Sequence, residues 1–178
     1  MSALKILGVD PALSRTGWAL LSVHTDSRVG ILGFGSITSK GRCRGEKLIG
    51  VLSDFRGVLA KWQPDEVHFE LPGKWMHQHL SRNAVEAMGM ARGVMLMACA
   101  ERHIPAFEVD FHTIRRQMLG HWKAGKPAVV KYLWTLGVEL PTRTGGYVDL
   151  DVVDAIMVAL HAAKLKDNRK DGAAGVLF

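Results

Sequence analysis

The stretch Ile6-Leu7-Gly8-Val9-Asp10-Pro11 is a short apolar run that ends in a carboxylate. Its Ile, Leu and Val residues predict a strand that is buried on both faces. Pro11 has no backbone N–H to donate to a sheet, so the strand should end before it. We therefore expect Asp10 at the edge of a sheet, where a metal ion or a substrate can reach it.

Three further acids stand in comparable places. Glu70 ends a second apolar strand, and Asp151 and Asp154 interrupt an apolar helix three residues apart, which places them on one helix face. A carboxylate on a buried helix is costly unless it is paired or binds a metal. Together the four acids predict an all-oxygen site of the kind that Mg²⁺ prefers.

Each acid also has a plainer explanation. Asp10 could form an Asp-Pro turn, and Glu70 could be an exposed acid at a strand end. Asp151 could be the cap or a first-turn acid of its helix, and Asp149 competes for the cap. The exact pair of helix ligands therefore stays open at this point.

The remaining pattern predicts one α/β domain with a mixed five-stranded sheet. The first three strands should form an antiparallel meander, with Gly17 and Gly30 supplying turn chemistry, and two later strands should run parallel. This strand order is similar to that of the ribonuclease H-like fold. We expect strands at 4–10, 16–23, 29–37, 66–70 and 104–109, and helices at 45–62, 82–102, 111–119, 127–136 and 150–165.

Composition narrows the class of protein. The chain has 178 residues and a net charge of +6, which is consistent with a polyanionic partner. Cys43 and Cys99 form no CxxC pattern, which disfavours a zinc site and suits a reducing cytosol. We expect a cytoplasmic protein of a bacterial or phage-infected cell with no membrane segment. Residues 1–165 should form the folded domain, and 166–178 a basic, Gly-rich tail without fixed structure.

These features resemble the RuvC family of Holliday junction resolvases, the crossover junction endodeoxyribonucleases of the ribonuclease H-like superfamily. Ala12 stands where the family usually has Gly. The resemblance extends to about residue 163 and rests on four segments: Ile6–Pro11 with Thr16-Gly17-Trp18, Phe69-Glu70, Gly89-Met90-Ala91-Arg92-Gly93-Val94 and Asp151-Val152-Val153-Asp154-Ala155.

The resemblance implies a structure-selective endonuclease that resolves four-way DNA junctions by paired, symmetric nicks. It implies two Mg²⁺ per site, with Mn²⁺ able to substitute, so that a phosphate is held from both sides during hydrolysis. The implied metal-binding and catalytic acids are Asp10, Glu70, Asp151 and Asp154. Lys126 is implied as a catalytic basic residue beside them. The family acts as a homodimer through its long helix, and branch-migration proteins are possible partners.

The residues expected to bind DNA are basic or aromatic, partly from the resemblance and partly because they lie in basic loops after the sheet: Lys74, Trp75, Arg115, Arg116, Lys123 and Lys126. Arg115 replaces a more usual Lys, and Trp75 takes the place of the aromatic that disturbs base pairing. The alternative for each is a solvated basic face. Two other functions also stay open: a nuclease of the same fold that acts on RNA or an RNA–DNA hybrid, and a catalytically silent junction-binding protein.

Overall fold

The computed structural model describes residues 3–26, 28–72, 80–140, 142–143 and 146–170. These residues contain a five-stranded sheet in the order β3-β2-β1-β4-β5. Strands β1, β2 and β3 pair antiparallel, whereas β4 and β5 run parallel to β1, so the predicted mixed sheet is confirmed. The strands are β1 (Leu4–Asp10), β2 (Arg15–Val23), β3 (Val29–Thr38), β4 (Glu66–Leu71) and β5 (Ala106–Asp110).

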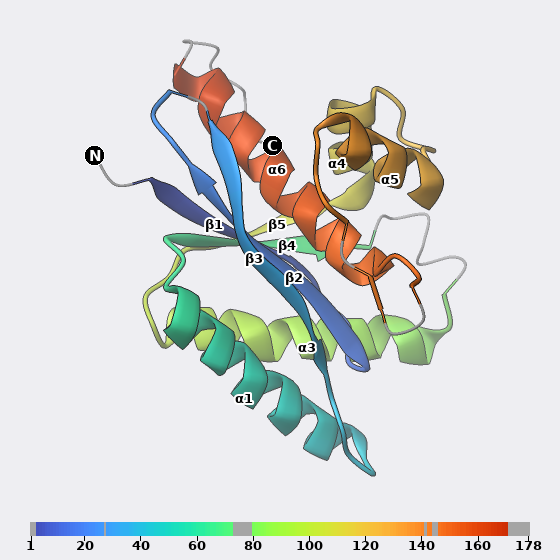
Figure 1. Ribbon diagram of the computed structural model, residues 1–178. Helices are drawn as coiled ribbons and strands as arrows, with labels where there is room; N and C mark the ends of the chain where they lie inside the picture. Colours follow the sequence, from blue (N-terminus) through green and yellow to red (C-terminus); the bar gives the residue numbers. More distant parts are fainter. Residues whose placement is uncertain (1–2, 27, 73–79, 141, 144–145, 171–178) are drawn as a thin grey trace.

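Helices cover both faces of this sheet (Figure 1). Helices α1 and α3 lie on one face, and α6 lies on the other with α4 and α5 beside it. All five predicted helices are present, but α6 continues to Lys170, beyond the expected end at residue 165. The division of the chain at residue 165 stays a prediction. The helices are α1 (Arg44–Trp62), α3 (Arg82–Ala100), α4 (Phe111–Leu119), α5 (Lys126–Thr135) and α6 (Leu150–Lys170).

Strand alternation decides which face receives the acids. On β1, Leu7 and Val9 are buried in the cluster with residues of α1 and α3, whereas Ile6 is buried with residues of α6. Because successive side chains point to opposite faces, Asp10 lies on the same face as Ile6. On β4, Phe69 belongs to the cluster with α1 and α3, so Glu70 also faces α6.

Two glycines let α6 lie directly on the strands. A Cβ atom on Gly8 would lie 2.2 Å from the carbonyl oxygen of Ala155, and one on Gly17 would lie 2.1 Å from that of Asp151. The expected turn role of Gly17 is wrong, because this residue lies inside β2. Its lack of a side chain instead admits the first turn of α6, a segment far away in the sequence.

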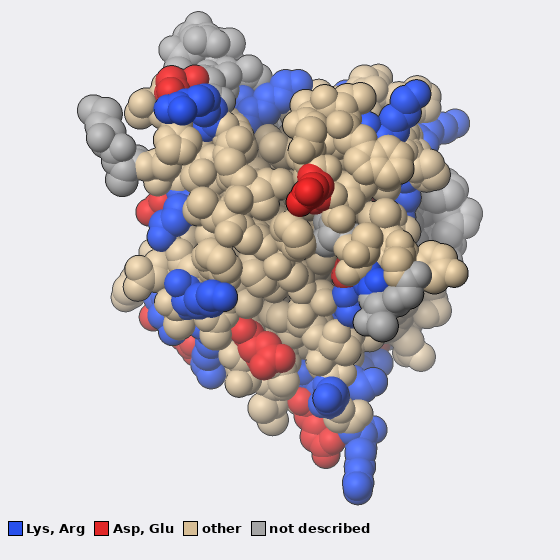
Figure 2. Space-filling view, viewed as in Figure 1, with Lys and Arg blue, Asp and Glu red and all other residues tan. Residues whose placement is uncertain are grey.

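The surplus of positive charge is not gathered over β3. Figure 2 shows a face whose centre is mostly uncharged, with Lys and Arg side chains mainly around its periphery. On β3 itself, Val29, Leu32 and Phe34 are exposed apolar residues. None of the helices within the described residues is both long and apolar enough to cross a membrane.

Candidate active site

A buried hydroxyl fixes the loop that follows Asp10. The Thr16 hydroxyl accepts a hydrogen bond from the Ala12 N–H at 3.1 Å and donates one to the Ala12 carbonyl at 2.8 Å. Thr16 has no exposed surface, so these two bonds are shielded from water. The chain is therefore held closed between the end of β1 and the start of β2, and Asp10 sits at a defined position. Ala12 fulfils this backbone role.

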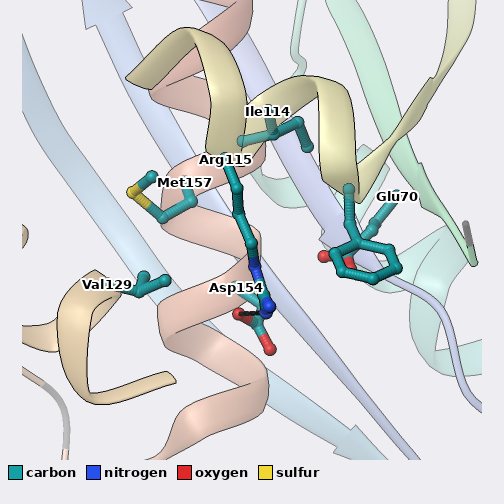
Figure 3. Close-up of a pocket in the computed structure, with 7 residues that line it drawn as sticks. Glu70, Ile114, Arg115, Val129, Asp154 and Met157 are labelled. Carbon is teal, nitrogen blue, oxygen red and sulfur yellow. Dashed lines mark ion pairs between the residues drawn. The ribbon is translucent and has the colours of Figure 1, made fainter. Parts of the chain in front are cut away.

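Three of the four predicted acids come together. Asp10, Glu70 and Asp154 each offer one carboxylate oxygen, and these oxygens all lie within 4.8 Å of one another. They come from the ends of β1 and β4 and from the second turn of α6, so the contact between helix and sheet creates the cluster. We call these three residues the acid triad. Figure 3 shows Asp154 on α6 with Glu70 close by, in a small pocket beside α4.

Burial and mutual repulsion oppose ionisation of the acid triad. Burial raises the pKa of Asp10 to about 7, and repulsion from Asp154 and Asp151 adds to the effect, while Lys126 opposes it. Burial, followed by repulsion from Asp10 and Asp154, likewise raises the pKa of Glu70 well above its ordinary value. A hard divalent cation would remove this repulsion, and all three donors are oxygens. The residues present therefore fit a metal ion of the Mg²⁺ class.

Two cations border the acid triad. Lys126 Nζ lies 2.9 Å from Asp154 Oδ2, and Arg115 Nη2 lies 4.0 Å from Asp154 Oδ1. Burial would lower the Lys126 pKa, but attraction to Asp154 and their hydrogen bond outweigh it and raise the pKa. Lys126 therefore stays charged at neutral pH.

Arg115 is held in one orientation. Its Nη1 donates a hydrogen bond to the Ala124 carbonyl at 2.9 Å, and its guanidinium lies 4.7 Å from the centre of the Phe111 ring. Figure 3 shows the long Arg115 side chain reaching from α4 to Asp154 on α6. A fixed guanidinium next to a carboxylate cluster can receive a phosphate oxygen without losing much side-chain entropy. The Lys-to-Arg difference at this position therefore keeps a cation at the site.

Asp151 occupies a different environment from the acid triad. It is a first-turn acid of α6, and its Oδ2 accepts a hydrogen bond from Arg143 Nη2 at 2.6 Å. Asp149 pairs with both Arg143 and Arg15. Burial would raise the Asp149 pKa, but hydrogen bonds from the two arginines outweigh it and lower the pKa. Of the described acids, Asp149 is thus a partner of the arginines and not a member of the acid triad.

Sequence reasoning missed Arg15 and Arg143. Neither belongs to a recognisable motif. Arg15 reaches its partners from β2, far away in the sequence, and Arg143 reaches its partners from the segment before α6. Arg92, on α3, forms an ion pair with Glu108 in which Nε and Oε1 are 2.6 Å apart. Arg92 therefore ties α3 to β5.

Of the other predicted DNA-binding residues, two are exposed, and two lie outside the described residues. Arg116 and Lys123 are exposed, and Lys123 Nζ lies 4.9 Å from the centre of the Trp122 ring. Trp122 is itself 42% exposed. Lys74 and Trp75 fall in 73–79, which lies outside the described residues.

Comparison with known sequences gives a consistent picture. A family model described as crossover junction endodeoxyribonuclease RuvC matches residues 6–162. The RuvC of Xanthobacter autotrophicus is 29% identical over 161 residues, which cover 90% of this chain and 89% of the relative. The RuvC of Prochlorococcus marinus is 30% identical over 157 residues, which cover 87% of this chain and 95% of the relative.

Solved structures share the fold. The RuvC of Thermus thermophilus, solved in complex with a Holliday junction substrate, has a TM-score of 0.75 and 19% identity, and the match covers 93% of this chain and 96% of that one. A yeast mitochondrial Holliday junction resolvase has a TM-score of 0.65 and 12% identity, with 96% of this chain and 85% of that one covered. The family model spans nearly the whole folded region, and the acid triad lies within it. The chain belongs to the RuvC family of crossover junction endodeoxyribonucleases.

Proposed function

We propose that this chain resolves four-way DNA junctions by paired, symmetric nicks, as a homodimer that depends on a divalent metal. Membership of the RuvC family makes it a crossover junction endodeoxyribonuclease, which is a phosphodiester hydrolase. The observation that carries the metal dependence is the acid triad, whose three carboxylate oxygens lie within 4.8 Å of one another. Burying three carboxyl groups this close together is costly for folding, and a bound divalent cation would offset that cost.

The proposed roles follow from position. Asp10, Glu70 and Asp154 would hold the metal, with Asp151 as a fourth ligand. Two Mg²⁺ per site are proposed, with Mn²⁺ able to replace them. When bound, such ions activate water and stabilise the charge that develops on a transferring phosphoryl group. The ammonium of Lys126, beside Asp154, can donate to a phosphate oxygen or to the leaving 3′-oxygen.

DNA would lie across α4, α5 and the segment between them. Arg115 and Lys126 border the acid triad, and Arg116 and Lys123 are exposed near by in the sequence. Phosphate contacts of this kind position a nucleic acid without reading its sequence. Lys74, named for its place in a basic loop, and the proposed wedge Trp75, named from the family resemblance, lie outside the described residues and stay predictions.

Helix α3 supports the proposed homodimer. Glycine in a helix interior costs about 1 kcal/mol relative to alanine, yet a Cβ on Gly89 or Gly93 would meet nothing within 4 Å. Packing within this chain therefore does not require these glycines. Met90 and Met97 are 42% and 48% exposed on the same helix. Small and apolar residues at an exposed helix face suit close approach by a second copy of α3.

Two further predictions rest on family membership. Branch-migration proteins are proposed partners, because resolution follows the movement of a junction. A cytoplasmic location in a bacterial or phage-infected cell also stays a prediction. Neither changes the chemistry proposed for the site.

The function is tested with a labelled synthetic four-way junction, a matched linear duplex and a matched RNA–DNA hybrid, each with Mg²⁺ or with EDTA. We expect paired nicks in the junction alone, and only with metal. Asp10→Asn should bind the junction without cutting it. Preferential cutting of the hybrid would favour the RNA-directed alternative, and junction binding without cutting by the wild type would favour a silent binding protein.

A further inference from the structure

A second charged cluster lies beside the acid triad. It consists of two arginines, Arg15 and Arg143, and two acids, Asp149 and Asp151. Arg143 Nη2 lies 2.6 Å from Asp151 Oδ2 and 3.0 Å from Asp149 Oδ1. Arg15 Nε lies 3.2 Å from Asp151 Oδ2. The fourth predicted metal ligand is thus held by cations at the rim of the site.

The two arginines are held differently. Arg15 belongs to β2, its side chain is 28% exposed, and its Nη1 also donates to the Thr38 hydroxyl at 3.3 Å. Arg143 comes from the segment before α6 and its side chain is 42% exposed. Its backbone is fixed, because its N–H donates to the Tyr147 carbonyl at 2.7 Å and its carbonyl accepts the Gly146 N–H at 3.0 Å. Arg143 therefore presents a guanidinium to solvent from a fixed backbone.

The start of α6 has support that does not depend on the pair between Arg143 and Asp151. The Asp149 carbonyl accepts the Val153 N–H at 3.0 Å, and the Asp149 carboxylate is paired with Arg15. Close contact of Gly17 with the Asp151 backbone fixes the helix on β2. The Asp151 side chain can therefore change partner without unwinding the helix.

We propose that Arg143 is a positioning residue that holds Asp151 away from the acid triad in the free protein and releases it when a DNA backbone phosphate binds the guanidinium. A phosphate and a carboxylate compete for the same planar donors. Released Asp151 lies one helical turn before Asp154 and can serve as a fourth carboxylate for the metal. The inference rests on the proposed function, and it makes junction binding and metal binding mutually favourable.

The first test measures Ca²⁺ binding to the DNA-free protein by isothermal titration calorimetry, in the wild type, Arg143→Gln, Asp151→Asn and the double variant. Loss of the shorter of the two ion pairs on Asp151 Oδ2, with Arg15 Nε left at 3.2 Å, should tighten Ca²⁺ binding about three- to tenfold in Arg143→Gln. In the Asp151→Asn background the same change should alter affinity by less than about twofold, because the acid that Arg143 restrains is absent. Equal tightening of Ca²⁺ binding in both backgrounds would show only the general effect of removing a positive charge, and it would overturn the proposal. No tightening in either background would overturn it as well.

The second test adds DNA. The Ca²⁺ affinity of each protein is measured with and without a four-way junction, whose binding is followed by fluorescence anisotropy. The junction should tighten Ca²⁺ binding in the wild type and in Arg102→Gln, a control at an exposed arginine in the turn that follows α3. In Arg143→Gln, the increase in Ca²⁺ affinity that the junction causes should shrink by the factor found in the first test. An unchanged increase would refute the proposal that a phosphate replaces Asp151 as the partner of Arg143.

These outcomes separate the inference from the proposed function. A wild type that binds neither Ca²⁺ nor the junction would contradict the proposed function itself. A wild type that binds both, with Arg143→Gln indistinguishable from it, would contradict the positioning role alone. Urea denaturation of each variant establishes that it is folded, and Arg143→Lys, which keeps the charge but loses the planar fork, should restore only part of the coupling.

Discussion

Replacement of Asp10 by Asn should stabilise the metal-free protein at neutral and alkaline pH, although it removes a proposed ligand. Burial first, and then repulsion from Asp154 and Asp151, raises the Asp10 pKa from 3.8 to about 7. One pKa unit corresponds to about 1.4 kcal/mol, so the shift of about 3 units penalises the ionised folded state by on the order of 4 kcal/mol. Asn carries no charge but must also lose hydration, so the expected net gain at pH 8 is about 2 to 4 kcal/mol.

The two pKa values of Asp10 decide whether stability rises or falls with pH. The unfolded chain loses its Asp10 proton near the ordinary pKa of 3.8, whereas the folded protein keeps it until about pH 7. The free energy of unfolding therefore falls as pH rises from about 3.8 to about 7. Above about pH 7, Asp10 causes no further change in it. The advantage of Asp10→Asn over the wild type should be about 2 to 3 kcal/mol larger at pH 8 than at pH 5.

The measurement is urea unfolding in EDTA at both pH values, followed by circular dichroism and repeated with excess Mg²⁺. Metal should stabilise the wild type at pH 8 and should have much less effect on the variant. The reasoning would be refuted by an Asp10→Asn protein that is destabilised equally at pH 5 and pH 8. Such a result would mean that the acid triad stores no charge repulsion.

Three other substitutions test separate parts of the structure. Lys126→Ala should lower junction cleavage about 10- to 100-fold. It should change the unfolding free energy by less than about 1 kcal/mol, because the ion pair with Asp154 is partly exposed. Single-turnover rates and urea unfolding measure the two effects, and an unchanged cleavage rate would remove Lys126 from the site. Gly17→Ala should lower the free energy of unfolding by about 1 to 3 kcal/mol, because its Cβ would meet the Asp151 backbone. The control Gly57→Ala places a Cβ that meets nothing within 4 Å, so it should be neutral or stabilising. Equal unfolding curves for the two variants would contradict the close approach of α6. Gly93→Glu should give folded monomers by light scattering, and a persistent dimer would exclude this face of α3.

Much of the fold could be predicted because its signals are local. The apolar runs that end at Asp10 and Glu70 are short and bounded by proline, and each became a strand with the acid at or next to its end. The helix at 45–62 was visible in its apolar spacing, and the structure places α1 at Arg44–Trp62. Alternation along each strand then places both acids on one face, which follows from strand geometry and needs no long-range information.

The surroundings of Asp151 could not be predicted in the same way. The residue lies three positions before Asp154, and helical spacing alone places both on one face. Its environment depends on Arg143, which follows a Pro- and Gly-bearing segment, and on Arg15, which starts a strand elsewhere in the chain. Residues that contribute a contact only after tertiary packing carry no periodic signal, so spacing gave the helix face of Asp151 but not its partner.

The glycines link fold and chemistry most directly. The acid triad needs α6 close enough to β1 and β4 for carboxylate oxygens from the three elements to lie within 4.8 Å of one another. That approach is possible because Gly8 and Gly17 expose bare backbone to Ala155 and Asp151. Any side chain at either glycine would lift the helix and separate its acids from those of the strands before it disrupted the sheet. The glycines of the first motif are therefore as necessary for metal binding as the acids, although they contribute no ligand atom.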